Sequence, residues 1–248
     1  MSIHTHRFHF HIRFISLSLL LLLFSACEVD TFIVPSGSYA KQVRAVGTFE
    51  SIEVANGFDL RITDSETTLF AIETYANVQE NIIVEVVGSK LRVYQKPNVS
   101  YLGDPDVKVY ISKSTLTDIV SSGGGNVLFE NQWSNPSLLI TVSGGGEISG
   151  EVLMGSRLEL TLSGGSKATL SGSTPMLKLN SSGGGTSRFL NLTSTEADAI
   201  VSGGGFLELQ VLNKFWVEAS GGSTVRYKGS PAIERSVLTG GSTLEKVP

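Results

Sequence analysis

The chain has 248 residues and a formal net charge of −4, which becomes −6 once a signal segment containing Arg7 and Arg13 is removed. Because the charge is negative and basic residues are not clustered, the composition argues against nucleic-acid binding. All four histidines lie among the first eleven residues, and Cys27 is the single cysteine. The rest of the chain therefore lacks the residues for an internal disulfide, a Ser-His-Asp or Cys-His catalytic site, or the usual zinc site.

Residues 1–26 have the pattern of an export signal, because two arginines precede a leucine-rich run that ends at Phe24. The segment Phe24-Ser25-Ala26-Cys27 resembles the lipobox of bacterial lipoproteins, with Phe24 where leucine is usual. We predict that Cys27 is acylated and that this lipid anchors the protein to the membrane. The expected location is the cell envelope, at the outer membrane. A plain secretory signal and an uncleaved anchor are the alternatives.

Residues 27–43 contain Pro35, Ser36 and Gly37 and are predicted to be a flexible tether. Strand patterning begins at about residue 44, and Asn56-Gly57 has the chemistry of a tight turn. Further strands are expected at residues 69–74, 82–87, 90–95 and 106–112, with one helical turn at 76–81. Because stacked repeats need an end cover, residues 44–115 are predicted to cap the repeats or to form their first irregular coils.

Residues 116–248 contain a repeated phrase, a Ser or Thr followed by two glycines, at steps of 18–21 residues. Its seven copies begin at Ser122, Ser143, Ser163, Ser182, Ser202, Ser220 and Thr239. Apolar residues recur one and three positions before the phrase and five positions after it, with polar residues between them. This alternation indicates strands with one buried face on each side of a glycine corner. A unit of this length cannot bury its apolar face alone, so the repeats must stack into a β-solenoid.

The glycines are predicted to make each corner possible, because glycine adopts positive φ angles without steric cost. We therefore expect Gly184→Val, within the central corner, to cost more stability than Gly172→Val in a connection. Residues 44–248 are predicted to form one folded unit.

The lipoprotein signal, the Phe49-x-x-Ile52-x-Val54-x-x-Gly57 opening and the Ser-Gly-Gly-Gly ladder resemble the putative auto-transporter adhesin, head GIN domain family. The resemblance covers roughly residues 46–230. It implies a right-handed β-helix-like fold and a binding role at the cell surface or envelope. It supplies no catalytic residue.

The ligand candidates in the sequence are its aromatic residues and the Ser/Thr column at the corners. The aromatic candidates are Trp133, Phe206, Trp216 and Tyr227. Asp104-Pro105-Asp106 is a candidate acid-base pair, but it is also ordinary turn composition. Aspartate does not recur at the position after the glycines, which argues against a calcium-binding array like those of other repeat proteins.

The predicted function is that of a non-enzymatic lipoprotein without cofactor or metal, an adhesin or binding scaffold for a glycan or for a host or matrix protein. The first alternative is a polysaccharide lyase or hydrolase on the same fold. The second is a structural envelope protein that forms homo-oligomers by end-to-end stacking. An enzyme should have a groove lined by several carboxylates and basic residues.

Overall fold

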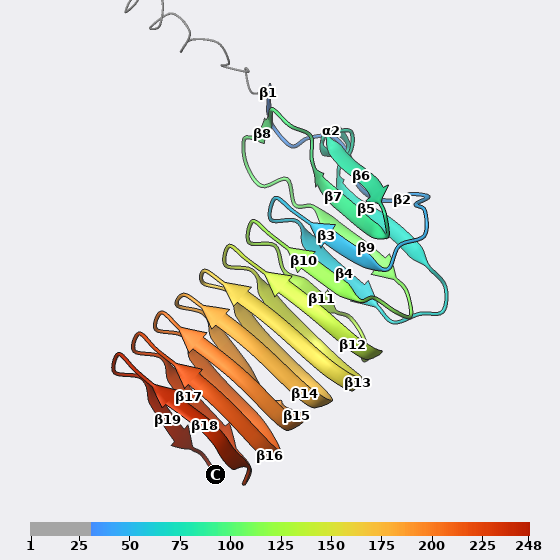
Figure 1. Cartoon of the computed structure of the whole chain (residues 1–248). Helices are drawn as coiled ribbons and strands as arrows, with labels where there is room; N and C mark the ends of the chain where they lie inside the picture. The colour runs from blue at the N-terminus through green and yellow to red at the C-terminus, as the bar shows by residue number, and fades with distance from the viewer. Residues whose placement is uncertain (1–30) are drawn as a thin grey trace, which may run out of the picture.

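The computed structural model describes residues 31–248, and the predicted signal peptide and Cys27 lie outside this range. The fold is an all-β solenoid, as the repeat period predicts (Figure 1). The helix α2 (Ala76–Gln79) is a single turn at the place where one was expected. Within residues 31–248 no helix is long and apolar enough to cross a membrane.

One continuous 17-stranded sheet winds around the solenoid. Each coil contributes two parallel faces to it, which we call the pre-corner sheet and the post-corner sheet by their position relative to the glycine corner. The pre-corner sheet contains β3 (Ser51–Val54), β10 (Asp118–Ser121), the later parts of β12 (Trp133–Val142), β13 (Glu147–Ser163), β14 (Lys167–Ser182), β15 (Thr186–Ser202) and β16 (Phe206–Ala219), and β18 (Ala232–Leu238). The post-corner sheet contains β4 (Asp59–Thr63), β11 (Val127–Phe129), the first parts of β13 to β16, β17 (Thr224–Lys228) and β19 (Thr243–Lys246). The corners stack along one edge of the molecule (Figure 1).

The strand register places equivalent residues of successive repeats beside one another. Ile119 pairs with Ile140 and Ile140 with Leu160, and all three side chains are fully buried. Neighbouring strands are about 4.8 Å apart, so such residues form continuous columns through the core. Counted from the Ser or Thr of each corner, the odd positions one and three before it and three to seven after it point inward in the central coils, and the even positions between them point outward. The sequence predicts this alternation correctly.

The segment expected to be a flexible tether is partly folded. Strand β1 (Thr31–Ile33) pairs in parallel with β8 (Val99–Tyr101), and β2 (Tyr39–Val43) pairs antiparallel with β5 (Leu69–Tyr75). The side chain of Asn77 also bonds to the carbonyl of Val34. The prediction of a flexible tether is therefore wrong for residues 31–43. Their composition is typical of a spacer, but their backbone groups form hydrogen bonds with other strands.

The strands between β4 and β10 extend both sheets at the N-terminal end of the solenoid (Figure 1). In the pre-corner sheet, β7 (Lys90–Gln95) pairs in parallel with β3 and antiparallel with β6 (Ile82–Val87). In the post-corner sheet, β9 (Lys108–Ser112) pairs in parallel with β4 and antiparallel with β5. The strands predicted in this half of the chain are thus present, with a later start for β9 than expected.

The Asn56-Gly57 turn is an early version of the glycine corner. It lies between β3 and β4, both of its residues have positive φ, and the Gly57 amide donates to the carbonyl of Ser122 at 3.0 Å. This confirms the prediction made from its turn chemistry. The solenoid therefore begins before the Ser-Gly-Gly repeats.

The predicted order of two glycine substitutions is wrong. A Cβ atom built on Gly184 meets nothing within 4 Å, and the φ of this residue is outside the left-handed region. Gly172 has φ +110°, and a Cβ there would lie 2.0 Å from the carbonyl oxygen of Val152. The constrained glycine is therefore the one in the connection, because it packs directly against the backbone of the preceding coil.

Candidate binding site

Two of the four predicted aromatic ligand residues point into the core. Trp133 is 0% exposed and packs against Phe129, with 5.9 Å between ring centroids, so its proposed role in ligand binding is wrong. Tyr227 is partly buried and packs against Phe215 at 5.7 Å. The inward orientation of Tyr227 leaves it a poor surface contact for a ligand.

The other two aromatic residues lie on the outer surface but on opposite sheets. Trp216 is in the later part of β16, on the pre-corner sheet, and Lys214 lies over its ring at 6.0 Å. Phe206 begins β16 on the post-corner sheet, and Arg226 lies over its ring at 5.7 Å. Both are half-buried. The structure therefore does not bring the four aromatic candidates together in one site.

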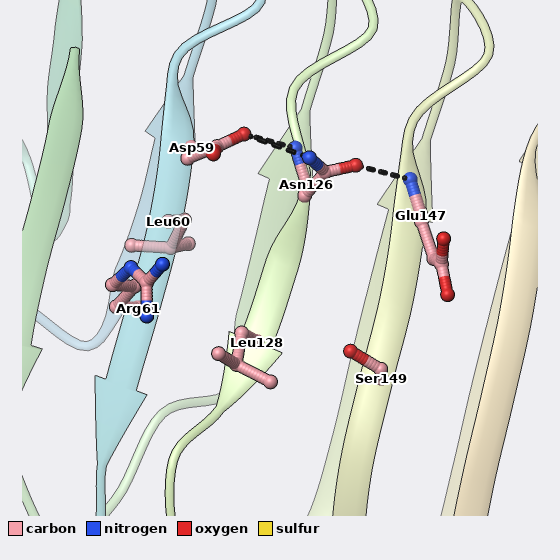
Figure 2. A pocket seen from close by; sticks show the side chains of 7 residues that line it. All are labelled: Asp59, Leu60, Arg61, Asn126, Leu128, Glu147 and Ser149. Atoms are coloured by element: carbon pink, nitrogen blue, oxygen red, sulfur yellow. Dashed lines mark hydrogen bonds between the residues drawn. The ribbon is translucent and has the colours of Figure 1, made fainter. Parts of the chain in front are cut away.

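A shallow hollow of about 270 Å³ lies on the outer surface of the post-corner sheet, across β4, β11 and β13 (Figure 2). The residues that line it are Asp59, Leu60, Arg61, Asn126, Leu128, Glu147 and Ser149. Most of them occupy even positions after a corner, so they share the outer face of three neighbouring coils. The hollow forms where the first irregular coil meets the repeats.

Side-chain hydrogen bonds join the three strands at the corner end of the hollow (Figure 2). The Asp59 Oδ1 atom accepts from both the backbone amide and the Nδ2 atom of Asn126, each at 3.0 Å. The Asn126 Oδ1 atom then accepts from the backbone amide of Glu147 at 3.0 Å. Asp59 and Asn126 are therefore fixed by structural bonds. The sequence pattern does not reveal this hydrogen-bonded ladder, because Asn126 is the one asparagine at this position among the seven repeats.

The remaining polar groups of the hollow are less constrained. Arg61 Nη1 lies 3.4 Å from Glu130 Oε1 at the side of the hollow. Among residues 31–248, the Glu147 carboxylate has neither a hydrogen-bond partner nor an ion pair. Leu128 and Ser149 provide an apolar and a hydroxyl surface beside it. This set of groups can accept hydrogen bonds from a ligand and can pack against its apolar face.

The Asp104-Pro105-Asp106 segment forms a turn. The Asp106 amide donates to Asp104 Oδ1 at 2.8 Å, and Asp106 has a positive φ of 41°. Lys108 Nζ lies 2.9 Å from Asp106 Oδ1, and its hydrogen bond holds the pKa of Asp106 below its ordinary value. A carboxylate kept ionised in this way is a poor general acid. In residues 31–248 no group of three or more His, Cys, Asp or Glu is arranged to hold a metal ion.

Solved structures of similar proteins share this fold. A putative adhesin from Bacteroides fragilis is 24% identical, with a TM-score of 0.79 over 87% of this chain and 100% of that one. A putative adhesin from Parabacteroides distasonis is 17% identical, with a TM-score of 0.69 over 88% of this chain and 100% of that one. A putative lipid binding protein from the same organism is 15% identical, with the same TM-score and coverage. At these identities the likeness concerns the fold.

No curated protein matches the chain. A family model matches residues 48–231, which include the first coil, the N-terminal strands and the Ser-Gly-Gly repeats up to Pro231. The chain therefore belongs to the family described as putative auto-transporter adhesin, head GIN domain.

Proposed function

We propose that this protein is a non-enzymatic binding protein of the cell envelope, an adhesin or binding scaffold anchored through a lipid on Cys27. Membership of an adhesin family supports a binding role at the surface. The observation that carries the proposal is the shallow, open hollow on a rigid sheet, with a free carboxylate beside two structurally fixed polar side chains. Such a surface presents ligand contacts at fixed spacing without enclosing a substrate.

The charge of the hollow indicates the chemistry of its ligand. Of the residues that line the hollow, Asp59 and Glu147 carry negative charge and Arg61 carries positive charge, and Arg61 is already paired with Glu130. The excess of carboxylates favours hydroxyl or ammonium donors over anions. We propose a neutral or amino-bearing glycan, or a basic segment of a host or matrix protein, as the ligand.

One observation favours the enzymatic alternative. Asp59 and Glu147 occupy the same column two strands apart, about 10 Å between backbones. Inverting glycosidases place two carboxyl groups about 6.5–9.5 Å apart on either side of the bond they cleave. However, Asp59 accepts two hydrogen bonds from Asn126, which leaves it poorly suited to activate water. The binding function is therefore the better supported of the two.

The test uses residues 28–248, which retain every described strand. This protein is screened against arrays of glycans and matrix proteins, and the same polysaccharides are assayed for cleavage. We expect saturable binding without product, and Glu147→Gln should weaken it about tenfold. The matched control is Asp198→Asn, which removes a half-buried carboxylate from the opposite sheet and should leave binding unchanged. Oligosaccharide product would contradict the proposal, and loss of binding in the control alone would move the site to the pre-corner sheet.

The structural alternative is favoured by the C-terminal coil. All seven residues of β18 are exposed, and within residues 31–248 it pairs with β16 along one edge only. An uncovered strand edge can pair with another chain. Sedimentation over a hundredfold range of concentration tests this alternative, which requires growth beyond a monomer.

A further inference from the structure

A second hollow, distinct from the candidate site, lies at the N-terminal end of the post-corner sheet. Its volume is about 460 Å³. It is bounded by the end of β2, the connection from Arg44 to Phe49, the start of β5 and Lys113 after β9. The Arg44 amide donates to the carbonyl of Phe70 at 3.0 Å, which fixes the connection against β5.

The walls of this hollow are mainly apolar. Phe49 and Phe70 are buried beneath it, and Val46 packs partly against the core. At its rim Val43 is 69% exposed and Leu69 is 36% exposed. The hollow therefore has exposed aliphatic side chains at its rim and buried aromatic residues beneath it. Covering this surface with another apolar group removes apolar area from water, which is favourable in free energy.

The charged residues of the hollow are two cations, Arg44 and Lys113, and its lining contains no carboxylate. Of the seven arginines in residues 31–248, Arg44 is the one without a carboxylate within 4.0 Å. Its guanidinium donates to neutral acceptors alone, the carbonyls of Gln79 and Ile82 and the Gln79 side chain. Burial also lowers the pKa of Arg44, which marks its positive charge as partly desolvated.

Both cations retain capacity for a ligand. The three bonds of the Arg44 guanidinium go to Gln79 and Ile82, which do not line the hollow, and leave two of its five N–H donors without a partner among the described residues. The Lys113 ammonium lies 5.2 Å from the centre of the Phe49 ring and has no ion pair within residues 31–248. An uncompensated, partly desolvated positive charge beside apolar walls fits a molecule that has an anionic group and a hydrocarbon body.

We propose that this hollow binds a fatty-acid-class anionic amphiphile, with its alkyl chain against Val43, Val46 and Leu69 and its carboxylate at Lys113 beside Arg44. The volume is within the range of small-molecule sites, about 300–1,000 Å³. A neutral alkyl chain would leave both cations unpaired, and a cationic one would be repelled. The carboxylate is therefore the specific part of the ligand and the alkyl chain the part that provides buried area.

The test is calorimetric titration of residues 28–248 with laurate below its micelle concentration. Dodecylammonium, with the same chain length and the opposite charge, is titrated in parallel, as are vesicles of anionic phospholipid. We expect one laurate per chain and at least tenfold weaker binding of dodecylammonium. Equal binding of the two amphiphiles, or binding to vesicles without binding of monomeric laurate, would overturn the proposal.

Two variants locate the site. Lys113→Gln should weaken laurate binding roughly fivefold, the effect of losing one partly exposed ion pair. Leu69→Asp should abolish it, because a carboxylate at the rim repels the ligand and removes apolar contact. The control is Lys178→Gln, which removes from the pre-corner sheet a half-buried lysine that has no ion pair among residues 31–248. Circular dichroism confirms folding, and unchanged affinity in both hollow variants would contradict the assignment.

Discussion

Replacing Gly172 or Gly184 with alanine tests the account of how the coils pack. In Gly172→Ala the new Cβ would lie 2.0 Å from the carbonyl oxygen and 2.9 Å from the carbonyl carbon of Val152. That carbonyl belongs to β13, which pairs with β14 on both sides of the contact, so it cannot move freely. In Gly184→Ala the Cβ meets open space.

The structure allows both costs to be worked out. A non-glycine residue at the φ of Gly172 costs about 1–3 kcal/mol, and relief of the clash adds about 1–3 kcal/mol. Gly172→Ala should therefore lower the free energy of unfolding by about 2–6 kcal/mol, and the melting temperature by about 2–4 °C for each kcal/mol in a chain of this size. Gly184→Ala should be neutral, or stabilising by about 0.4–1 kcal/mol through reduced freedom of the unfolded chain.

The assay is thermal and urea unfolding of residues 28–248, followed by circular dichroism. Gly229 provides an internal replicate, because its Cβ would lie 2.0 Å from the carbonyl oxygen of Val211 and its φ is +111°. Its alanine variant should also be destabilised, by less if the exposed terminal coil already frays. If Gly172→Ala and Gly184→Ala had equal effects, or if Gly184→Ala were the worse, the packing described for the connections would be refuted.

Three further predictions concern other parts of the chain. Cys27→Ser should release the protein from membranes into the soluble fraction on cell fractionation, and continued retention would count against acylation. Acrylamide should quench the fluorescence of Trp216 in a Trp133→Phe variant. In Trp216→Phe the emission of Trp133 should be blue-shifted and protected from acrylamide, because Trp133 is fully buried. Equal quenching in the two variants would contradict that burial. Because Lys108 lowers the pKa of Asp106, this carboxylate should contribute stability above its ordinary pKa of 3.8 that is lost as the pH falls through its lower folded value. Asp106→Asn should therefore destabilise the protein by less than about 1 kcal/mol at pH 7, and this effect should shrink as the pH falls below 3.8. An effect that grows on acidification would contradict this assignment.

The sequence predicts the solenoid well because its period and alternation are physical requirements of stacking. Odd positions near each corner must enter a shared core, and the column of Ile119, Ile140 and Leu160 does so. The same rule already indicates that Tyr227, seven positions after Ser220, points inward. The prediction that Tyr227 contacts a ligand conflicts with this rule.

Other features depend on geometry that a repeat alignment does not contain. Trp133 begins β12, eleven positions after Ser122, and the alternation is interrupted before it, because Asn131, nine positions after Ser122, is exposed. The Ser-Gly-Gly phrase likewise does not specify which glycine has positive φ, and at the central corner it is Gly183. The prediction of a flexible tether is wrong for residues 31–43 because their strand partners lie far away in the sequence, at Leu69–Tyr75 and Val99–Tyr101.

The division between inward and outward positions also separates stability from binding. Most even positions close to a corner can change without opening a cavity, so ligand contacts can vary there at little thermodynamic cost. Asp59 and Asn126 are exceptions, because their side chains bond to the next strand and their loss would disturb the sheet. Glu147 accepts no bond through its side chain within the described residues, although its backbone amide donates one to Asn126 Oδ1. It is therefore the residue of the hollow whose replacement reports on ligand binding with the least effect on the fold.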